Sequence, residues 1–440
     1  MLNICYHFFY MKNAWFFIPS AYFLEGLPYG VVNVLSAIIY TRLNIPNDVF
    51  IFWTSWLYLP WVLKMFWAPL VEGNSTKRRW VISMQFALAL VFLLIALTLK
   101  TNAFFTASVC GFFAGAFLSA THDIALDGFY LIALSEKDQA YFVGWRTVFY
   151  RFSLIFISGP LVVFAGKLEK YFGDVATAWF WVLCVVALVT ALLAAYHNFV
   201  LPKPQADKPE QNEYKGLAFY LDIFKKYFTQ KQIVYILLFI FLYRFGDACL
   251  EKVVVPFMLK PLAEGGLALD TETYGWIKGT LGLIAIICGN IFGGWVLSKF
   301  GFKKCLVVFA LFLVLPNFFY VYMAYFHPSI SVITALLVTE NFGNGLAMMA
   351  FTVFIMYVSE GEYKTSFYAI STGLMALGMM VPNMLSGKMQ VLLGYDKFFL
   401  AVSIISLVTF AVVPLAYKIQ KLTKADEFIK RTKTKELMEG

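Results

Sequence analysis

Two aspartates and a histidine stand together in the apolar stretch SATHDIALDGFY, residues 119–130. Asp123 and Asp127 are four residues apart, so a helix would place both carboxyls on one face. His122 precedes Asp123 and would point about 100° away from it. Carboxyl and imidazole groups can bind and release protons. The stretch therefore predicts a proton-coupling site, with helix packing as an open alternative for His122.

Other ionisable side chains also lie inside apolar segments, and acids recur in every third one: 14–40, 103–133, 232–259 and 331–357. An acid at the centre of a membrane helix costs about 2.5–3.5 kcal/mol, so it usually faces a cavity or a partner. We expect Asp247 to take part in proton coupling as well. The polar side chains predicted to bind a substrate are Glu25, Asn33, Arg244, Lys278, Glu340 and Asn341.

Two ion pairs can be predicted from spacing. Asp127 and Arg151 flank one hairpin at similar distances from its turn, and Arg244 and Asp247 are three residues apart on one helix. These pairs could hold helices together, or an acid could lose its partner during a conformational change and carry a proton. The sequence leaves both roles open. Lys64, in the run WVLKMFWAPL, can extend its long side chain to the cytoplasmic surface.

The composition requires a membrane around these residues. Of the 440 residues, 61% are hydrophobic and 14% are charged, whereas soluble domains are about half apolar and about a quarter charged. The net charge of +9 is spread between apolar segments, which fits orientation in a bilayer and argues against a nucleic-acid partner. The six cysteines have no metal-ligand spacing, so we expect neither a metal nor a cofactor.

Apolar runs of about 20 residues predict membrane-spanning helices. Twelve such runs lie near 14–40, 50–71, 80–99, 103–133, 147–166, 178–200, 232–259, 274–297, 305–325, 331–357, 366–387 and 398–417. If both termini are cytoplasmic, the inner connecting segments hold 22 Lys and Arg and the outer ones hold 7. Positive charge accumulates on the cytoplasmic side, so the sequence predicts a multi-pass inner-membrane protein with both termini inside the cell.

A polar stretch, LPKPQADKPEQNEYKG, separates six predicted helices from six others. We therefore expect an N-terminal bundle at 1–200, a cytoplasmic linker at 201–231, a C-terminal bundle at 232–417 and a basic tail at 418–440. The basic loops after the second and eighth helices repeat in position, length and charge. Two six-helix halves with such loops are the layout of a major-facilitator transporter.

Several motifs resemble those of the AmpG-type muropeptide permeases, in the peptide/acetyl-coenzyme A transporter branch of the major facilitators. They are LKMFWAPL, SATHDIALDGFY, FVGWRTVFYRFSLIFISG, LYRFGDA, IKGTLGL and ENFGNGLAMMAF. The resemblance implies proton-driven uptake of anhydro-muropeptide cell-wall fragments, with a role in transport for Asp123 and Asp127. The family usually has Gln at the position of His122.

The leading hypothesis is thus a monomeric, proton-coupled importer of muropeptides that works by alternating access, and not an enzyme. The same fold could instead carry acetyl-coenzyme A, a siderophore or a drug, and could export it. A membrane acyltransferase using His122 and Asp123 is the alternative from another class, but no second nucleophile or metal set lies near these residues.

Overall fold

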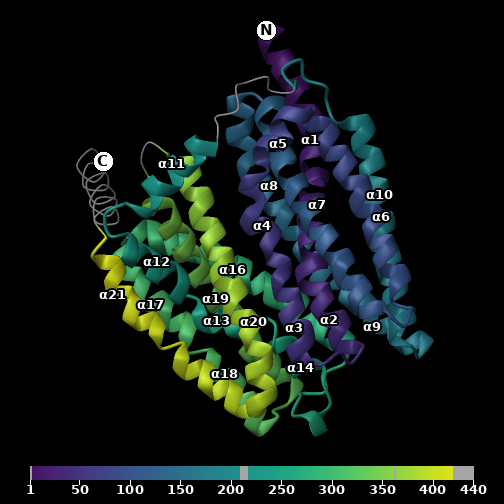
Figure 1. Cartoon of the computed structure of the whole chain (residues 1–440), viewed down its shortest axis with the longest axis vertical. Helices are drawn as coiled ribbons and strands as arrows, with labels where there is room; N and C mark the ends of the chain where they lie inside the picture. Colours follow the sequence, from purple (N-terminus) through teal and green to yellow (C-terminus); the bar gives the residue numbers. More distant parts are fainter. Residues whose placement is uncertain (1, 209–216, 361–362, 420–440) are drawn as a thin grey trace. The chain divides into compact units, whose positions relative to one another are not determined.

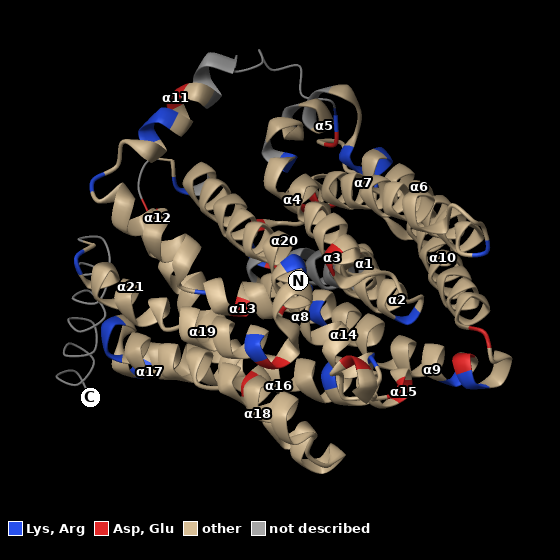
Figure 2. Cartoon of the chain, turned by 60° about the horizontal axis from the view of Figure 1, so that its bottom comes forward, with Lys and Arg blue, Asp and Glu red and all other residues tan. Residues whose placement is uncertain are grey.

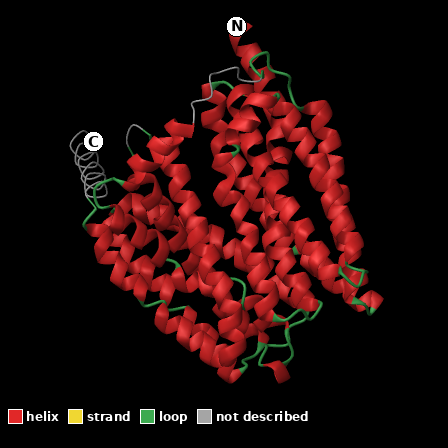
Figure 3. Ribbon diagram, in the orientation of Figure 1, coloured by secondary structure: helices red, strands yellow, loops and turns green. Residues whose placement is uncertain are grey.

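The computed structural model describes residues 2–208, 217–360 and 363–419, and every regular element in these ranges is a helix (Figure 3). Ten helical segments are long and apolar enough to cross a membrane. One of them, Ser366–Tyr417, covers two predicted helices, 366–387 and 398–417. The predicted helix 50–71 is divided into shorter pieces and so does not reach that length. The all-helical fold with twelve predicted membrane helices is confirmed.

Contacts within the chain group it into two compact units, each described here by itself (Figure 1). Unit 1 contains Met1–Ile45, Leu63–Tyr214 and Asp270–Thr280, and unit 2 contains Pro46–Val62, Lys215–Leu269 and Leu281–Gly440. Segment 46–62 comes from the first half of the sequence but groups with unit 2. Segment 270–280 comes from the second half but groups with unit 1. The division into halves at 1–200 and 232–417 stays a prediction.

Helices make up the described part of unit 1. They are α1 (Leu2–Gly30), α2 (Ser36–Arg42), α5 (Ala68–Asn74), α6 (Lys77–Thr98), α7 (Phe104–Ala133), α8 (Glu136–Ser158), α9 (Pro160–Phe172), α10 (Val175–Val200) and α15 (Thr271–Tyr274). The π-helix η1 (Val31–Leu35) joins α1 to α2, the 3₁₀-helix η3 (Lys64–Phe66) precedes α5, and the π-helix η5 (Gly275–Gly282) follows α15.

Unit 2 is also built from helices in its described residues. Its elements are α3 (Asn47–Ser55), the 3₁₀-helix η2 (Trp56–Tyr58), α4 (Leu59–Leu63), α11 (Leu217–Phe228), α12 (Ile233–Leu242), α13 (Phe245–Leu250), α14 (Val254–Leu259), the 3₁₀-helix η4 (Leu262–Glu264), α16 (Leu283–Phe300), α17 (Phe302–Val314), α18 (Asn317–Phe326), α19 (Ile330–Val358), α20 (Lys364–Ile405) and α21 (Val408–Tyr417). Residue Gly394 kinks α20 at φ +75°.

Short polar side chains fix where several helices begin. Thr76, Ser135, Asp174 and Asp270 precede α6, α8, α10 and α15. Each accepts a hydrogen bond from the backbone N–H three residues later, at 3.2, 3.3, 2.9 and 2.8 Å. Such caps satisfy N–H groups that have no partner within the helix. They therefore set the ends of the helices that carry the charged residues described below.

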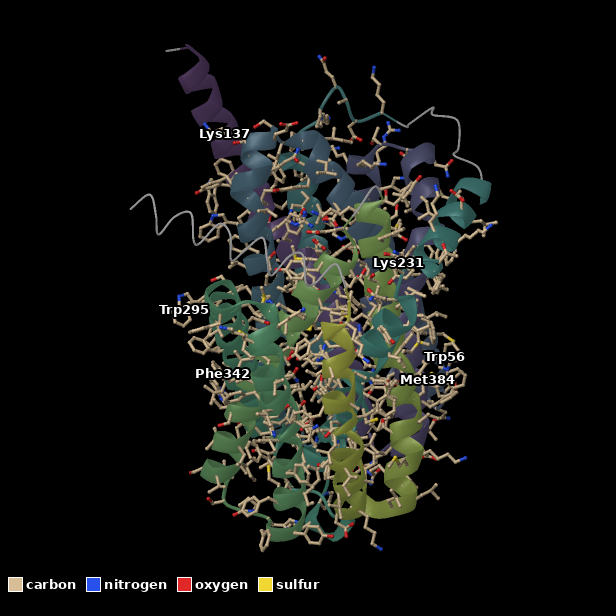
Figure 4. All side chains as sticks on the ribbon, turned by 90° about the vertical axis from the view of Figure 1, so that its left-hand side faces the viewer. Trp56, Lys137, Lys231, Trp295, Phe342 and Met384 are labelled. Atoms are coloured by element: carbon tan, nitrogen blue, oxygen red, sulfur yellow. The ribbon has the colours of Figure 1, made fainter. Side chains whose placement is uncertain are left out.

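The outward faces of the helices are apolar. Lys, Arg, Asp and Glu are sparse along the helices (Figure 2), and large apolar residues such as Leu192 and Phe199 are 60% and 85% exposed. Trp295 lies at the outer edge of the helices in Figure 4 and is 54% exposed. Exposed apolar surface of this extent marks contact with a partner or a membrane. Lipid is the solvent that matches it, so polar groups inside the spans must find partners within the protein or in a wet cavity.

Candidate functional site

A concentration of charge in unit 1 lies around α7 (Phe104–Ala133), where Asp123 and Asp127 are one helical turn apart. Asp123 forms an ion pair with Lys64, and Asp127 forms one with Arg146. The side chain of Asp123 is 16% exposed and that of Asp127 is 44% exposed. Charged groups this far inside a membrane protein require such partners. With Glu25, these residues form what we call the α7 charge cluster.

Arg146 is held by more than its ion pair. Its guanidinium carbon lies 4.7 Å from the ring centroid of Tyr22 and 5.0 Å from that of Tyr130. Cation–π contacts of this kind restrict a guanidinium to one place. The predicted pairing of Asp127 with Arg151 is wrong, because α8 begins at Glu136 and brings Arg146 opposite Asp127.

Glu25 on α1 completes the cluster. Its carboxyl interacts electrostatically with that of Asp123, and its Oε2 atom is buried without a partner among the described residues. Two carboxyls that interact in a buried site favour a state in which one of them carries a proton. The α7 charge cluster contains three acids and two bases, so one bound proton makes it electrically neutral.

The sequence did not predict the role of Lys64, whose side chain was expected to extend towards the membrane surface. It lies in η3, a 3₁₀ turn that interrupts the predicted helix 50–71. Sequence spacing could not show this turn, and the available signal was the lysine itself inside the apolar run WVLKMFWAPL. A buried carboxylate on another helix is the natural partner for such a cation.

His122 faces a different set of groups. It is 1% exposed, and its Nε2 accepts a hydrogen bond from Gln85 Nε2 at 3.0 Å. Gln85 Oε1 accepts from His197 Nδ1 at 2.9 Å, and His197 Nε2 lies 2.9 Å from the Ser20 hydroxyl. This His122–Gln85 network connects α7, α6, α10 and α1. With the amide in this orientation His122 Nε2 carries no proton, since an amide nitrogen only donates.

Unit 2 holds a second charged group, the α13 charge cluster, where the predicted ion pair between Arg244 and Asp247 is present. Asn344 donates to Asp247 Oδ1 at 2.7 Å and accepts from Arg244 at 3.3 Å. Arg244 also donates to the Met348 sulfur at 3.1 Å. Both charged side chains are less than 15% exposed, at 14% and 12%. Asn344 was not predicted from the sequence, although it follows Glu340 by one turn of the same helix.

Glu251 and Lys252 extend this polar region along the chain. Glu251 accepts hydrogen bonds from the Tyr58 hydroxyl at 2.7 Å and from Asn383 at 2.8 Å. Lys252 is 2% exposed and donates to the Thr54 carbonyl at 2.9 Å. The partners come from sequence segments about 130 to 200 residues away, so spacing could not reveal them.

The other predicted substrate-binding residues are mostly buried. Asn33 lies in η1, is 7% exposed and donates to the Tyr29 carbonyl at 3.3 Å. Glu340 and Asn341 are 7% and 2% exposed, and Asn341 donates to Glu340 at 2.8 Å. Lys278 is half-buried in η5. Asn33 and Lys278 belong to unit 1, and Glu340 and Asn341 belong to unit 2.

A further charged group in unit 1 lies where α2, α9 and α15 end or begin. Glu169 accepts hydrogen bonds from Arg42 at 3.2 Å, Trp179 at 2.8 Å and Thr271 at 2.7 Å. Lys170 lies 2.7 Å from Asp270. Burial raises the pKa of Asp270, but hydrogen bonds from Lys170 and Thr273 outweigh it and hold this pKa at about 2. Asp270 therefore stays ionised near neutral pH and is unsuited to exchanging the transported proton.

Comparison with known proteins gives a consistent picture. Residues 20–382 match the sequence profile described as Major Facilitator Superfamily. A Rickettsia conorii protein named after AmpG is 25% identical over 367 residues, which are 79% of this chain and 83% of that protein. The anhydromuropeptide permease of Escherichia coli K12 is 23% identical over 351 residues, 77% of this chain and 67% of the permease.

Solved structures show the same fold. The nucleoside transporter NupG, solved as a point mutant, superposes with a TM-score of 0.70 at 12% identity and covers 92% of this chain and 99% of its own. A bacterial homologue of the human lysosomal transporter Spinster, inward-facing and unoccupied, gives a TM-score of 0.67 at 12% identity and covers 94% and 98%. At this identity the likeness concerns the fold alone.

Proposed function

The chain belongs to the major facilitator superfamily, and from that premise we propose that it imports anhydro-muropeptides by proton-coupled alternating access. Because the matched family and the named relatives are transporters, the chain is a transporter and not an enzyme. The muropeptide substrate is supported by the Escherichia coli permease, whose name states it. We further propose that the protein works as a monomer in the inner membrane, with both termini in the cytoplasm.

The observation that supports proton coupling is the electrostatic interaction between the Glu25 and Asp123 carboxyls beside Lys64. A proton that this pair binds can leave when the two carboxyls separate. Asp123 would then keep Lys64 as its partner, whereas Glu25 would be left ionised with a buried oxygen. Such a change in partner is the physical basis of proton release in a buried acid.

Asp127 has a different role in this proposal. Its partner Arg146 is fixed between two tyrosine rings, so Asp127 serves to hold α7 against α8. In unit 2, Arg244, Asp247 and Asn344 offer both donors and acceptors to a polar substrate. Asp247 is already paired twice, which favours substrate binding or helix packing over proton transfer at this position.

Accumulation of labelled anhydro-muropeptide in membrane vesicles, with and without an imposed pH gradient, tests the proposal. We expect Glu25→Gln and Asp123→Asn to abolish accumulation driven by the gradient. Exchange of labelled for unlabelled substrate without a gradient should continue, since exchange needs no net proton movement. Asp222→Asn is a matched control, because this acid lies on the exposed side of α11 and pairs with Lys226 at 2.9 Å.

Two results would contradict the proposal at different levels. Wild-type protein that accumulates no muropeptide under either condition would refute the substrate. Normal gradient-driven accumulation by both Glu25→Gln and Asp123→Asn would refute this proton site but leave the substrate standing. The double variant Lys64→Gln, Asp123→Asn removes both charges of the ion pair and should fold better than Lys64→Gln alone, which leaves one buried charge without a partner. Loss of gradient-driven accumulation in this double variant would therefore reflect lost proton coupling and not lost stability.

A further inference from the structure

Arg151 has an unusual position in unit 1. It belongs to the membrane-crossing segment Tyr141–Phe172 and lies ten residues after its beginning. At a rise of 1.5 Å per residue, this places it about 15 Å along the segment. A guanidinium is charged at every pH that proteins experience, so its charge must be compensated in some way.

The described residues provide no such compensation. Arg151 makes no hydrogen bond or ion pair with any residue that the structure describes. Other cations inside the spans differ in this respect. Lys64, Arg146 and Arg244 each have a carboxylate partner, and Lys252 has a backbone carbonyl. The nearest candidate by sequence, Asp127, is already bound to Arg146.

The side of α8 on which Arg151 lies limits which groups its side chain can contact. Tyr150 and Ser153 pack against Gly26 of α1, whereas Val148 and Phe152 are 53% and 57% exposed and apolar. Arg151 is turned about 100° from each of its chain neighbours and shares its side of the helix with Thr147 four residues earlier. The residue is half-buried and lies on another side of the helix than Tyr150 and Ser153, which face α1.

We infer that Arg151 binds the carboxylate of the transported peptide. The inference rests on the proposed function. A guanidinium offers paired N–H donors that match the two oxygens of a carboxylate, and a muropeptide carries a carboxylate at the end of its peptide. Binding would supply the missing charge and hydrogen bonds together, which a neutral sugar alone could not do.

The test compares two ligands on purified, full-length protein in lipid nanodiscs. One is an anhydro-muropeptide with a free peptide carboxylate, and the other is the same molecule with each carboxylate converted to an amide. We expect the wild-type protein to bind the acid at least about tenfold more tightly, as is usual for a charge-assisted hydrogen bond. Arg151→Gln should remove this preference, because the acid falls to the affinity of the amide while amide binding stays nearly unchanged.

Arg151→Lys keeps the positive charge but lacks the paired N–H donors, so it should retain part of the preference for the acid over the amide. This variant also tests the inference if Arg151→Gln does not fold. Arg79→Gln is the matched control, since Arg79 is an exposed arginine in the first turn of α6. A preference of wild-type size in folded Arg151→Gln would overturn the inference and leave the proposed function intact. Wild-type protein that binds neither ligand would instead overturn the proposed function, and this inference with it.

Discussion

At the scale of single residues, the partner of each ionisable group determines what that group can do. Asp127 and Asp123 have the same chemistry and are one turn apart, yet Asp127 meets an arginine fixed between aromatic rings. Asp123 meets a lysine and a second carboxyl. A carboxyl next to another carboxyl exchanges protons more readily than one held by a guanidinium. The difference supports Asp123 and Glu25 as the coupling pair.

The His122–Gln85 network gives a prediction about His122. We expect His122→Gln to keep transport and stability close to wild type, because a glutamine oxygen can accept the hydrogen bond that Gln85 donates to His122. His122→Leu should reduce the free energy of unfolding by about 1–3 kcal/mol, since it leaves a buried amide without its partner. Thermal unfolding of the purified variants and vesicle transport measure the two effects.

Comparing His122→Gln with His122→Leu shows whether His122 serves helix packing or carries the transported proton. If the imidazole carries the transported proton, His122→Gln will fold normally and lose gradient-driven accumulation, contrary to our expectation. Gln85→Leu is a useful control, because it disconnects His122 from His197 without removing either imidazole. It should resemble His122→Leu in its stability and confirm that the network acts as one unit.

The residues of the candidate site could be predicted in part. The apolar surroundings of Asp123, Asp127 and Glu25 marked them from the sequence alone. The partners were harder to predict, because two arginines five residues apart on a helix point about 140° away from each other. The apolar run predicts a helix that begins near 147, but Ser135 caps α8 and the helix starts at Glu136. Moving this boundary replaces Arg151 by Arg146 as the partner of Asp127.

At the scale of elements, the regular helices were predictable and their interruptions were not. A continuous apolar run predicts a spanning helix, but the predicted helix 50–71 alternates between α and 3₁₀ turns from Ser55 to Trp67. Pro60 lies within this stretch and removes one backbone donor. The apolar pattern is the same for a regular and an interrupted helix, so hydropathy cannot distinguish them.

Close helix contact within unit 1 gives a prediction at this scale. Gly279 in η5 lies against the break between α8 and α9, where an added Cβ atom would fall 1.7 Å from the carbonyl oxygen of Ser158. That oxygen belongs to the backbone and cannot move aside as a side chain could. We expect Gly279→Ala to reduce the free energy of unfolding by at least the upper part of the usual range of about 1–3 kcal/mol for overpacking.

Gly144→Ala in α8 is the matched control for this substitution. Nothing lies within 4 Å of an added Cβ atom at Gly144, and alanine stabilises an exposed helical position by up to about 1 kcal/mol. Denaturation of both variants in the same detergent compares them directly. Equal stabilities would mean that η5 does not pack closely against Ser158 in the membrane.

At the scale of the whole molecule, the distribution of charge makes a prediction about orientation. The outward apolar faces require a bilayer, and the basic residues concentrate in the connecting segments on the side of both termini. Positive charge is retained on the cytoplasmic side during insertion. We therefore expect segment 201–231 to lie in the cytoplasm and segment 260–273 to lie in the periplasm.

Two exposed alanines in these segments, Ala206 and Ala263, allow a matched test of this orientation. Each is replaced by cysteine in a variant without the native cysteines, and cells are treated with a maleimide that does not cross the inner membrane. Ala263→Cys should be labelled in intact cells, whereas Ala206→Cys should be labelled only after the inner membrane is opened. The reverse pattern would invert the protein, and the acids of α7 would then release their proton on the other side.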